Sequence, residues 1–203
     1  MNIYGASGHG KVIIGIVHSR MEQIHQILDD NPVITGIYDY PVVHKYTPEI
    51  LRRKTIVAIG NNRTRKKIVK RFPGPFHKGI SHSNAVVDGT VELGEGTVIM
   101  ANAAVNADTI IGTHCIINTG SVVEHDCVIE NFVHISPGAV LAGGVKIGEG
   151  SHIGVGAVVI PGKEIGKWCT IGAGAVIIED VPDFATVVGN PGKIIKIANT
   201  TNE

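Results

Sequence analysis

Every sixth residue from Val87 to Ile177 is valine, leucine or isoleucine. The positions are Val87, Leu93, Ile99, Val105, Ile111, Ile117, Val123, Ile129, Ile135, Leu141, Ile147, Ile153, Val159, Ile165, Ile171 and Ile177. Amphipathic helices repeat near 3.6 residues and simple strands every two residues, so a strict period of six matches neither. This period is typical of short strands joined at corners, with three strands to a coil. We therefore predict that each coil takes eighteen residues.

A second register of the repeat supports this interpretation. The residues two positions before the aliphatic ones are small or β-branched, except for Lys163. Glycines recur at two phases of the coil, and they are Gly94, Gly112, Gly148 and Gly166 in one phase and Gly154 and Gly172 in the other. We expect the aliphatic and small residues to fill a triangular prism. Glycine is expected at corners where a Cβ would not fit. About five coils at roughly 4.8 Å each predict a rod of about 25 Å.

Such a rod presents flat outer faces made of parallel strands. Faces of this kind tend to pack against copies of themselves. We predict a homotrimer with clefts between neighbouring prisms, in preference to a monomeric rod.

Residues 1–80 lack the period of six and alternate between predicted strands and helices. A strand at Ile3–Tyr4 enters a glycine loop, Gly5 to Gly10, and a helix follows over 11–17. Loop amides and a helix N-terminus together form an anion site. The spacing is G-x-x-G-x-G and differs from the dinucleotide pattern G-x-G-x-x-G, so the loop alone is a weak indication.

Two further predicted strands strengthen this interpretation. The strand over 24–28 ends in Asp29 and Asp30, and the strand over 55–59 runs into Gly60. Ligands of open α/β sheets bind at the carboxyl ends of parallel strands, where carboxylates suit a ribose or a base edge. We predict a small Rossmann-like domain that holds a nucleotide diphosphate. The alternative, that the glycines only make turns and the two aspartates only cap a strand, stays open.

A basic helix is predicted over 63–71. We expect its basic side chains to be exposed to solvent, in preference to binding a phosphate group. Within the repeat, His125 lies on an outward phase with an acid on each side, Glu124 and Asp126. A carboxylate beside a neutral imidazole fixes the tautomer and raises the pKa above about 6.5, which makes a good general base.

Other polar residues of the repeat are weaker candidates. His134 and His152 differ by eighteen positions and should stack on adjacent coils. We favour plain polar surface for His152 and His114. The three cysteines, Cys115, Cys127 and Cys169, occupy the small inward register, so we interpret them as core residues and not nucleophiles.

Composition limits the possible partners. The chain has 18 Lys and Arg against 18 Asp and Glu, so it offers no electrostatic footprint for nucleic acid or an anionic membrane. No run of about 18 apolar residues is present, and the N-terminus lacks the pattern of a signal peptide. The cysteine pattern favours a reducing compartment. We expect a cytoplasmic protein with no membrane insertion.

With these residues considered, the chain resembles the PglD/NeuD-type nucleotide-sugar acetyltransferases, which are hexapeptide-repeat acyltransferases, over nearly its whole length. The motifs that carry the resemblance are Tyr4-Gly5-Ala6-Ser7-Gly8-His9-Gly10, Leu28-Asp29-Asp30, Ala58-Ile59-Gly60-Asn61-Asn62 with Arg65-Lys66-Lys67, Asn118-Thr119 with Val122 to Cys127, and Val188-Gly189-Asn190-Pro191-Gly192-Lys193. The resemblance implies a left-handed parallel β-helix, a trimer, and acetyl-CoA bound between two β-helices. It implies three parts: a UDP-sugar-binding domain over 1–80, the acetyltransferase β-helix over 81–180, and a tail over 181–203 that contributes to the CoA site.

The resemblance also implies site residues. His125 is the expected general base, Asp126 the carboxylate that raises its basicity (the family often has Glu there), and Asn118 an orienting group. Acetyl-CoA is expected at His134, Gly143, Val155 and Ala173, although close relatives often carry glycine in place of Ala173. The UDP-sugar contacts are expected at Ser7, Gly8, His9, Asp29, Asp30 and Gly60. No metal is expected.

The predicted function is N-acetylation of a UDP-linked 4-amino-4,6-dideoxy sugar. The amine attacks the thioester directly, with His125 accepting its proton and a backbone NH or His134 stabilising the oxyanion. Three alternatives remain open. They are O-acetylation of a sialic-acid-like sugar, a zinc enzyme of the γ-carbonic anhydrase type that uses histidines such as His114, His125, His134 and His152, and a sugar-nucleotide sensor without catalysis.

Overall fold

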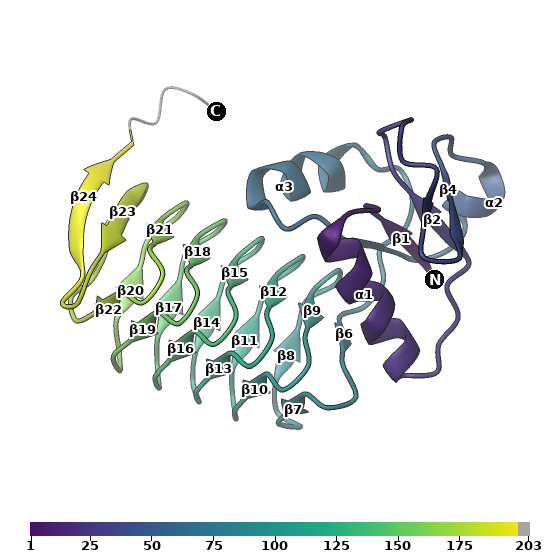
Figure 1. Cartoon of the computed structure of the whole chain (residues 1–203). Helices are drawn as coiled ribbons and strands as arrows, with labels where there is room; N and C mark the ends of the chain where they lie inside the picture. The colour runs from purple at the N-terminus through teal and green to yellow at the C-terminus, as the bar shows by residue number, and fades with distance from the viewer. Residues whose placement is uncertain (199–203) are drawn as a thin grey trace.

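The computed structural model describes residues 1–198, which form an N-terminal α/β domain and a long β-solenoid (Figure 1). The α/β domain contains five strands and three helices. The elements are β1 (Asn2–Tyr4), α1 (Gly8–Ser19), β2 (Gln26–Leu28), β3 (Gly36–Ile37), β4 (Tyr40–Val43), α2 (Pro48–Leu51), β5 (Thr55–Val57) and α3 (Asn62–Arg71).

The sheet of this domain has the order β3-β4-β2-β1-β5, and β2, β1 and β5 are parallel. The three predicted strands and both predicted helices are therefore present. Between them the chain also forms β3, β4 and α2, which were not expected from the sequence. These elements are two to four residues long, too short to show a period.

From Ile80 onward the chain coils through two-residue strands. The strands are β6 (Ile80–Ser81), β7 (Val86–Val87), β8 (Glu92–Leu93), β9 (Val98–Ile99), β10 (Ala104–Val105), β11 (Ile110–Ile111), β12 (Ile116–Ile117), β13 (Val122–Val123), β14 (Val128–Ile129), β15 (His134–Ile135), β16 (Val140–Leu141), β17 (Lys146–Ile147), β18 (His152–Ile153), β19 (Val158–Val159), β20 (Glu164–Ile165), β21 (Thr170–Ile171) and β22 (Val176–Ile177). Each pairs in parallel with strands eighteen residues away, such as Ile117 with Ile135. The predicted fold class, an N-terminal α/β domain followed by a β-solenoid of six-residue repeats, is confirmed.

The strands form three faces of a prism, which we number by sequence. The first face is β7-β10-β13-β16-β19-β22, the second is β8-β11-β14-β17-β20, and the third runs from β6 through β9, β12, β15, β18 and β21. The third face continues into β23 (Ala185–Val188) and β24 (Lys193–Ile197), which form an antiparallel pair at the end of the rod. The segment over 181–198 thus caps the solenoid.

The two registers of the repeat form the core of the solenoid. Ile117, Ile135 and Ile153 are completely buried, and so are the small residues Cys127 and Ala139 between them. Burying one such aliphatic side chain contributes about 1.5–3 kcal/mol. The period of six therefore records which side chains point inward.

Glycine has two separate uses at the corners. Gly94 and Gly148 keep ordinary φ values, but a Cβ there would lie 2.5 Å and 2.6 Å from the backbone of the next coil. The left-handed backbone occurs two residues later, for example at Gly96 and Gly150. Non-glycine residues such as Trp168 also adopt it, with a φ of 54°.

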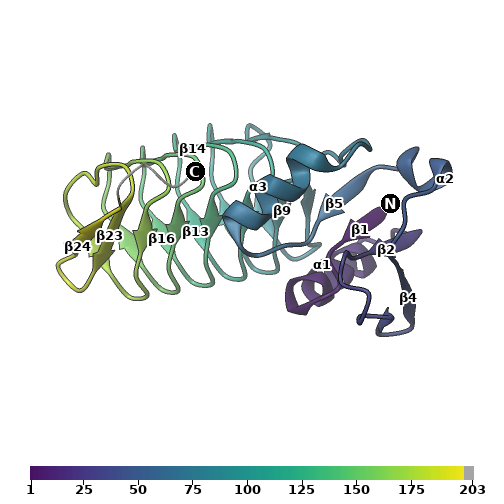
Figure 2. The same ribbon diagram turned by 90° about the horizontal axis from the view of Figure 1, so that it is seen from above.

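The α/β domain covers the beginning of the third face (Figures 1 and 2). Outward side chains of this face, Ile80, Val98 and Ile116, share one apolar cluster with Ile13 of α1 and Ile3 of β1. Helix α3 lies along the corner between the second and third faces, because it contacts the backbone of that corner. No helix among residues 1–198 is long and apolar enough to cross a membrane.

Candidate active site

The predicted base lies at the corner between the first and second faces, where Asp126 adopts a φ of 59°. This turn brings the Nδ1 of His125 to 2.7 Å from the Asp126 carboxylate. The hydrogen bond to Asp126 raises the pKa of His125, and Glu124 adds a smaller attraction. Because Asp126 occupies Nδ1, the exposed Nε2 is the atom that can accept a proton.

Gly143, one coil further along the same corner, makes room for this imidazole. A Cβ at Gly143 would lie 2.7 Å from Cε1 and 2.8 Å from Nε2 of His125. The structure thus places Gly143, predicted as an acetyl-CoA contact, directly against the predicted base. Glu124, on the other side of His125, accepts a hydrogen bond from Asn106 at 2.9 Å.

A second polar cluster lies at the other edge of the first face and on the third face. Asn118 Nδ2 is 2.9 Å from Nε2 of His134. The rings of His134 and His152 stack with their centroids 4.8 Å apart and their planes at 9°, as predicted from their spacing. His152 is in turn 2.7 Å from the hydroxyl of Ser136. Burial lowers the pKa of His134 to about 3, with smaller contributions from His152, Arg65 and His9.

His134 is therefore neutral near pH 7. Its Nε2 faces the Asn118 amide, and the ring and Gly60 line the same pocket. An amide NH2 group can only donate, so Nε2 is the acceptor and Nδ1 carries the proton.

The structure does not bring all predicted catalytic residues together within one chain. His125 lies at the corner that joins β13 to β14, whereas Asn118 lies at the corner that joins β12 to β13. The first face separates them. Of the predicted acetyl-CoA residues, Gly143 shares the corner of His125, and Val155 and Ala173 share the corner of Asn118.

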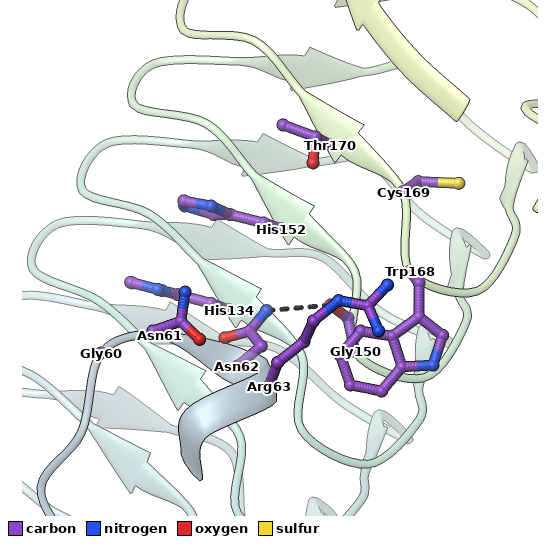
Figure 3. A pocket seen from close by; sticks show the side chains of 10 residues that line it. All are labelled: Gly60, Asn61, Asn62, Arg63, His134, Gly150, His152, Trp168, Cys169 and Thr170. Carbon is purple, nitrogen blue, oxygen red and sulfur yellow. Dashed lines mark hydrogen bonds between the residues drawn. The ribbon is translucent and has the colours of Figure 1, made fainter. Parts of the chain in front are cut away.

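A pocket of about 380 Å³ lies between the start of α3 and the third face (Figure 3). Its lining is mostly polar, and it consists of Gly60, Asn61, Asn62, Arg63, His134, Gly150, His152, Trp168, Cys169 and Thr170. The Arg63 guanidinium lies over the Trp168 ring at 4.5 Å, and the imidazoles of His134 and His152 point in from neighbouring strands. We call this space the junction pocket.

A second pocket of about 560 Å³ lies at the carboxyl ends of β1, β2 and β5, where the sequence predicts a nucleotide. It is lined by Tyr4, Asp29, Asp30, Asn31, Ile59, Thr64, Lys67, Ile68 and Arg71, and we call it the nucleotide pocket. Asp29 already accepts hydrogen bonds from the backbone amides of Ala6 and Asn31, at 2.8 Å and 2.9 Å. It therefore shapes the glycine loop.

Asp30 accepts hydrogen bonds from the Tyr4 hydroxyl and from Arg71 of α3. Burial and the bond to Asp30 raise the pKa of Tyr4, so its hydroxyl remains a donor. Lys67 and Arg71 bring positive charge to this pocket, whereas Arg65 is only 1% exposed. The expectation that the basic helix is a solvated face is therefore wrong for Arg65.

The glycine loop combines structural and open positions. Gly5 has a φ of 117°, and a Cβ there would lie 2.7 Å from the Ala58 carbonyl, so its role is in the turn. Ser7 and Gly8, by contrast, are exposed at the start of α1, and nothing lies within 4 Å of a Cβ at Gly8. The Ser7 side chain makes no capping hydrogen bond, which leaves the first amides of α1 free for an anion.

His9, the third predicted contact of this loop, faces the interior. Its Nε2 is buried and has no hydrogen-bond partner among the described residues. Burial lowers the pKa of His9 to about 4, with a smaller contribution from Arg65. A buried nitrogen without a hydrogen-bond partner costs free energy.

His114 corrects one expectation. It is 2% exposed, stacked on Phe132 and edge-on to Phe76, and therefore not polar surface. The three cysteines are buried as predicted, and burial raises the pKa of the Cys115 thiol to about 11. Among residues 1–198, no group of three or more His, Cys, Asp and Glu side chains is placed to hold a metal ion.

Tyr4, Asn62 and Trp168 line these pockets, and Arg65 lies behind the loop between them. None of the four was predicted as functional from the sequence. Tyr4, Asn62 and Arg65 belong to the quoted motifs, but no spacing rule distinguishes them. Trp168 occupies a corner position where the other coils have His114, Phe132 and Gly150. A large aromatic residue at an outward corner is the signal that could have identified it.

Comparison with known proteins agrees with this architecture. The model of the PglD N-terminal domain matches residues 1–72, and the bacterial transferase hexapeptide repeat matches 82–125 and 126–161. UDP-N-acetylbacillosamine N-acetyltransferase of Bacillus subtilis (strain 168) is 39% identical over 111 residues, which cover 49% of this chain and 50% of that protein. The match thus spans about half the length of this curated relative.

Solved structures of other proteins match over almost the whole chain, and the following two are examples. PerB from Caulobacter crescentus, in complex with CoA and GDP-perosamine, is 40% identical with a TM-score of 0.89 and 96% coverage of each chain. The acetyltransferase domain of PglB from Neisseria gonorrhoeae FA1090, in complex with acetyl coenzyme A, is 37% identical with a TM-score of 0.88, covering 96% of this chain and 98% of that one. The matches thus define the class of this protein as a transferase built from a β-solenoid joined to a small α/β domain. The chain belongs to the hexapeptide-repeat sugar acetyltransferases with a PglD-type N-terminal domain, and the predicted resemblance is confirmed.

Proposed function

We propose that this protein transfers the acetyl group of acetyl-CoA to the free amine of a nucleotide-linked amino-dideoxy sugar. The observation that carries the proposal is His125, bonded to Asp126 at 2.7 Å with Nε2 free, on a chain that also has a nucleotide pocket. Relatives named for N-acetylation of UDP- and GDP-linked sugars support the acceptor class.

In the proposed mechanism, His125 Nε2 accepts the proton as the amine nitrogen attacks the thioester carbonyl. The carbon–nitrogen bond forms and the carbon–sulfur bond breaks. The departing CoA thiolate takes the proton from the His125 imidazolium and leaves as the thiol, which returns His125 to its neutral form. Asp126 stabilises the imidazolium that forms. The buried thiols have raised pKa values, so direct transfer without an acyl-enzyme is favoured.

We infer that the protein is a homotrimer, because the first face presents an apolar row that no other element within residues 1–198 covers. Its outward residues are Val86, Ala104, Val122, Val140, Val158 and Val176. The third face is partly covered by the α/β domain, and the second face carries ion pairs such as Lys146 with Glu164 at 2.6 Å. Burying an apolar row against a second copy stabilises the assembly.

This assembly would also complete the site. His125 and Gly143 flank one edge of the first face, and Asn118, Val155 and Ala173 flank the other. If the first face packs against neighbouring copies in a closed ring, opposite edges of neighbouring chains face each other across a cleft. The proposed cleft holds acetyl-CoA, with the tail from residue 181 at its far end. The part of the tail over 199–203 lies outside the described residues.

We propose that the nucleotide pocket holds the nucleotide of the acceptor, with UDP as the first candidate. Free amides near Ser7 and Gly8 suit the diphosphate, and Lys67 and Arg71 add positive charge. His9 and Gly60 lie toward the junction and suit the sugar. The GDP-linked ligand of the 40% identical PerB makes GDP the second candidate to test.

The test is thiol release from acetyl-CoA with a panel of acceptors. The panel contains UDP- and GDP-linked amino sugars, their N-acetylated products and free sialic acids. Release that needs a nucleotide-linked free amine supports the proposal. Release only with a sialic acid would favour the O-acetylation alternative. No release, together with stoichiometric zinc in the purified protein, would favour the metalloenzyme alternative, and nucleotide-sugar binding without any release would favour the sensor.

A further inference from the structure

A buried cation without a carboxylate partner joins the two domains. Arg65 of α3 is 1% exposed, and no carboxylate among residues 1–198 forms an ion pair with it. Its guanidinium instead donates to five oxygen atoms, which is the full capacity of an arginine. Because a buried charge is costly unless its hydrogen bonds are satisfied, each of these acceptors matters.

Four of the five acceptors are backbone carbonyls that form two pairs, one on the solenoid and one in the loop after β5. Nε donates to the His114 carbonyl at 2.8 Å, and Nη2 donates to the Phe132 carbonyl at 2.9 Å, both at corners of the solenoid. Nη1 donates to the carbonyls of Ile59 and Gly60 at 2.8 Å and 3.1 Å, in the loop after β5. Nη2 also reaches Asn62 Oδ1 at 2.8 Å. One side chain therefore fixes this loop against the rod.

The corner contacts continue along the rod in register with the coils. Asn62 Nδ2 donates to the Gly150 carbonyl at 3.0 Å, eighteen residues beyond Phe132. The next corner residue, Trp168, lies below Arg63 at 4.5 Å and Lys66 at 5.0 Å. The start of α3 thus follows consecutive coils of one corner (Figure 2).

The loop that Arg65 holds lies between the two pockets. Ile59 lines the nucleotide pocket, and the next residue, Gly60, lines the junction pocket beside His134. The backbone of Gly60 lies close enough to the His134 ring to affect its electrostatic environment. A shift of this loop would therefore change the distance between a bound nucleotide and His134.

We propose that Arg65 is a positioning residue that holds the Ile59–Gly60 loop against the solenoid and so sets how far the acceptor amine reaches from the nucleotide pocket. This inference rests on the proposed function. It assigns to Arg65 a role in turnover that is separate from nucleotide affinity, since Arg65 itself does not line the nucleotide pocket.

The experiment compares Arg65→Lys and Arg65→Gln with the wild type. Lysine keeps the charge but has three donors at a single point, and glutamine keeps two donors without charge, so neither can satisfy the five acceptors. Lys70→Met is the matched control, because it removes one cation from the exposed side of the same helix. The readouts are kcat, the KM for each substrate, and the Kd of the nucleoside diphosphate alone.

We expect kcat to fall by about 10- to 100-fold in both Arg65 variants, as for a misplacement of roughly 1 Å. The Kd of the nucleoside diphosphate should stay within about threefold, and Lys70→Met should match the wild type. A kcat within about twofold of wild type in either folded variant would overturn the proposal. So would an equal proportional loss of kcat and of nucleotide binding, because that is the result of plain unfolding.

Trp168 supplies a readout that needs no activity. It is the single tryptophan of the chain and lies beneath α3. Loosening of the start of α3 should increase quenching of its fluorescence by acrylamide in both Arg65 variants, but not in Lys70→Met. If the wild type proves inactive with every acceptor, the proposed function fails. The docking role of Arg65 is then decided by this quenching, and unchanged quenching refutes it.

Discussion

Replacement of Gly143 by alanine tests whether His125 acts from the position that the corner gives it. Gly143 does not have a positive φ, so alanine fits the backbone, and the only change is the new methyl group. That methyl would lie 2.7 Å from His125 Cε1, whereas ordinary contact begins at 3.4 Å, so the ring must retreat by about 0.7 Å. A displacement of this size costs roughly 10- to 100-fold in rate when the moved group is the base.

The assay is steady-state thiol release, with thermal unfolding measured on the same samples. Gly89→Ala is the matched control, since Gly89 occupies the same corner position three coils earlier and has nothing within 4 Å of its Cβ. We expect Gly143→Ala to lose kcat while both variants unfold at nearly the wild-type temperature. Full activity of Gly143→Ala would refute the reasoning, and so would an equal loss in Gly89→Ala.

Three further predictions follow from the described contacts. The bond to Asp126 raises the pKa of His125, so the neutral base is lost as the pH falls through a value above about 6.5. Asparagine tolerates the left-handed turn, so Asp126→Asn should lower the pKa of His125 and move the acid limb of the kcat/KM profile to lower pH. An acid limb that does not move would contradict this role of Asp126. Val140→Glu on the first face should convert the trimer to monomers in light scattering, whereas Val128→Glu on the second face should not; a trimer that survives the first change rejects this interface. Ile147→Ala in the 1%-exposed core should cost about 2–5 kcal/mol in urea unfolding with activity per folded molecule preserved, and a cost below about 1 kcal/mol would contradict the packing account.

The solenoid was predictable because its repeat couples sequence to geometry directly. A core position that recurs every six residues leaves little freedom, so the inward register, the coil length and the stacking of His134 on His152 all follow from counting. The positions with left-handed backbone at the corners were harder to predict from the sequence. Residues as different as Asp126, Phe132 and Trp168 adopt it, because the next coil imposes the turn whichever side chain is present.

The candidate site was only partly predictable. The pair His125 and Asp126 is adjacent in the chain, so local chemistry revealed it. Arg65 could not be distinguished from its basic neighbours in the sequence. Its buried position depends on the backbone carbonyls of His114 and Phe132, which lie 49 and 67 positions further along the chain. The prediction that His114 is polar surface was wrong for the same reason, because the rings of Phe76 and Phe132 that bury it come from two other segments.

The central claim is that His125 is the base for acetyl transfer to a nucleotide-linked amine. The most direct measurement is mass spectrometry of the acceptor after incubation with acetyl-CoA and either wild-type protein or His125→Ala. The account predicts an acceptor that gains one acetyl group as a hydroxylamine-stable amide with the wild type, and no gain above background with the variant, which should still bind acetyl-CoA. An acetylated acceptor formed at the wild-type rate by His125→Ala would contradict the account.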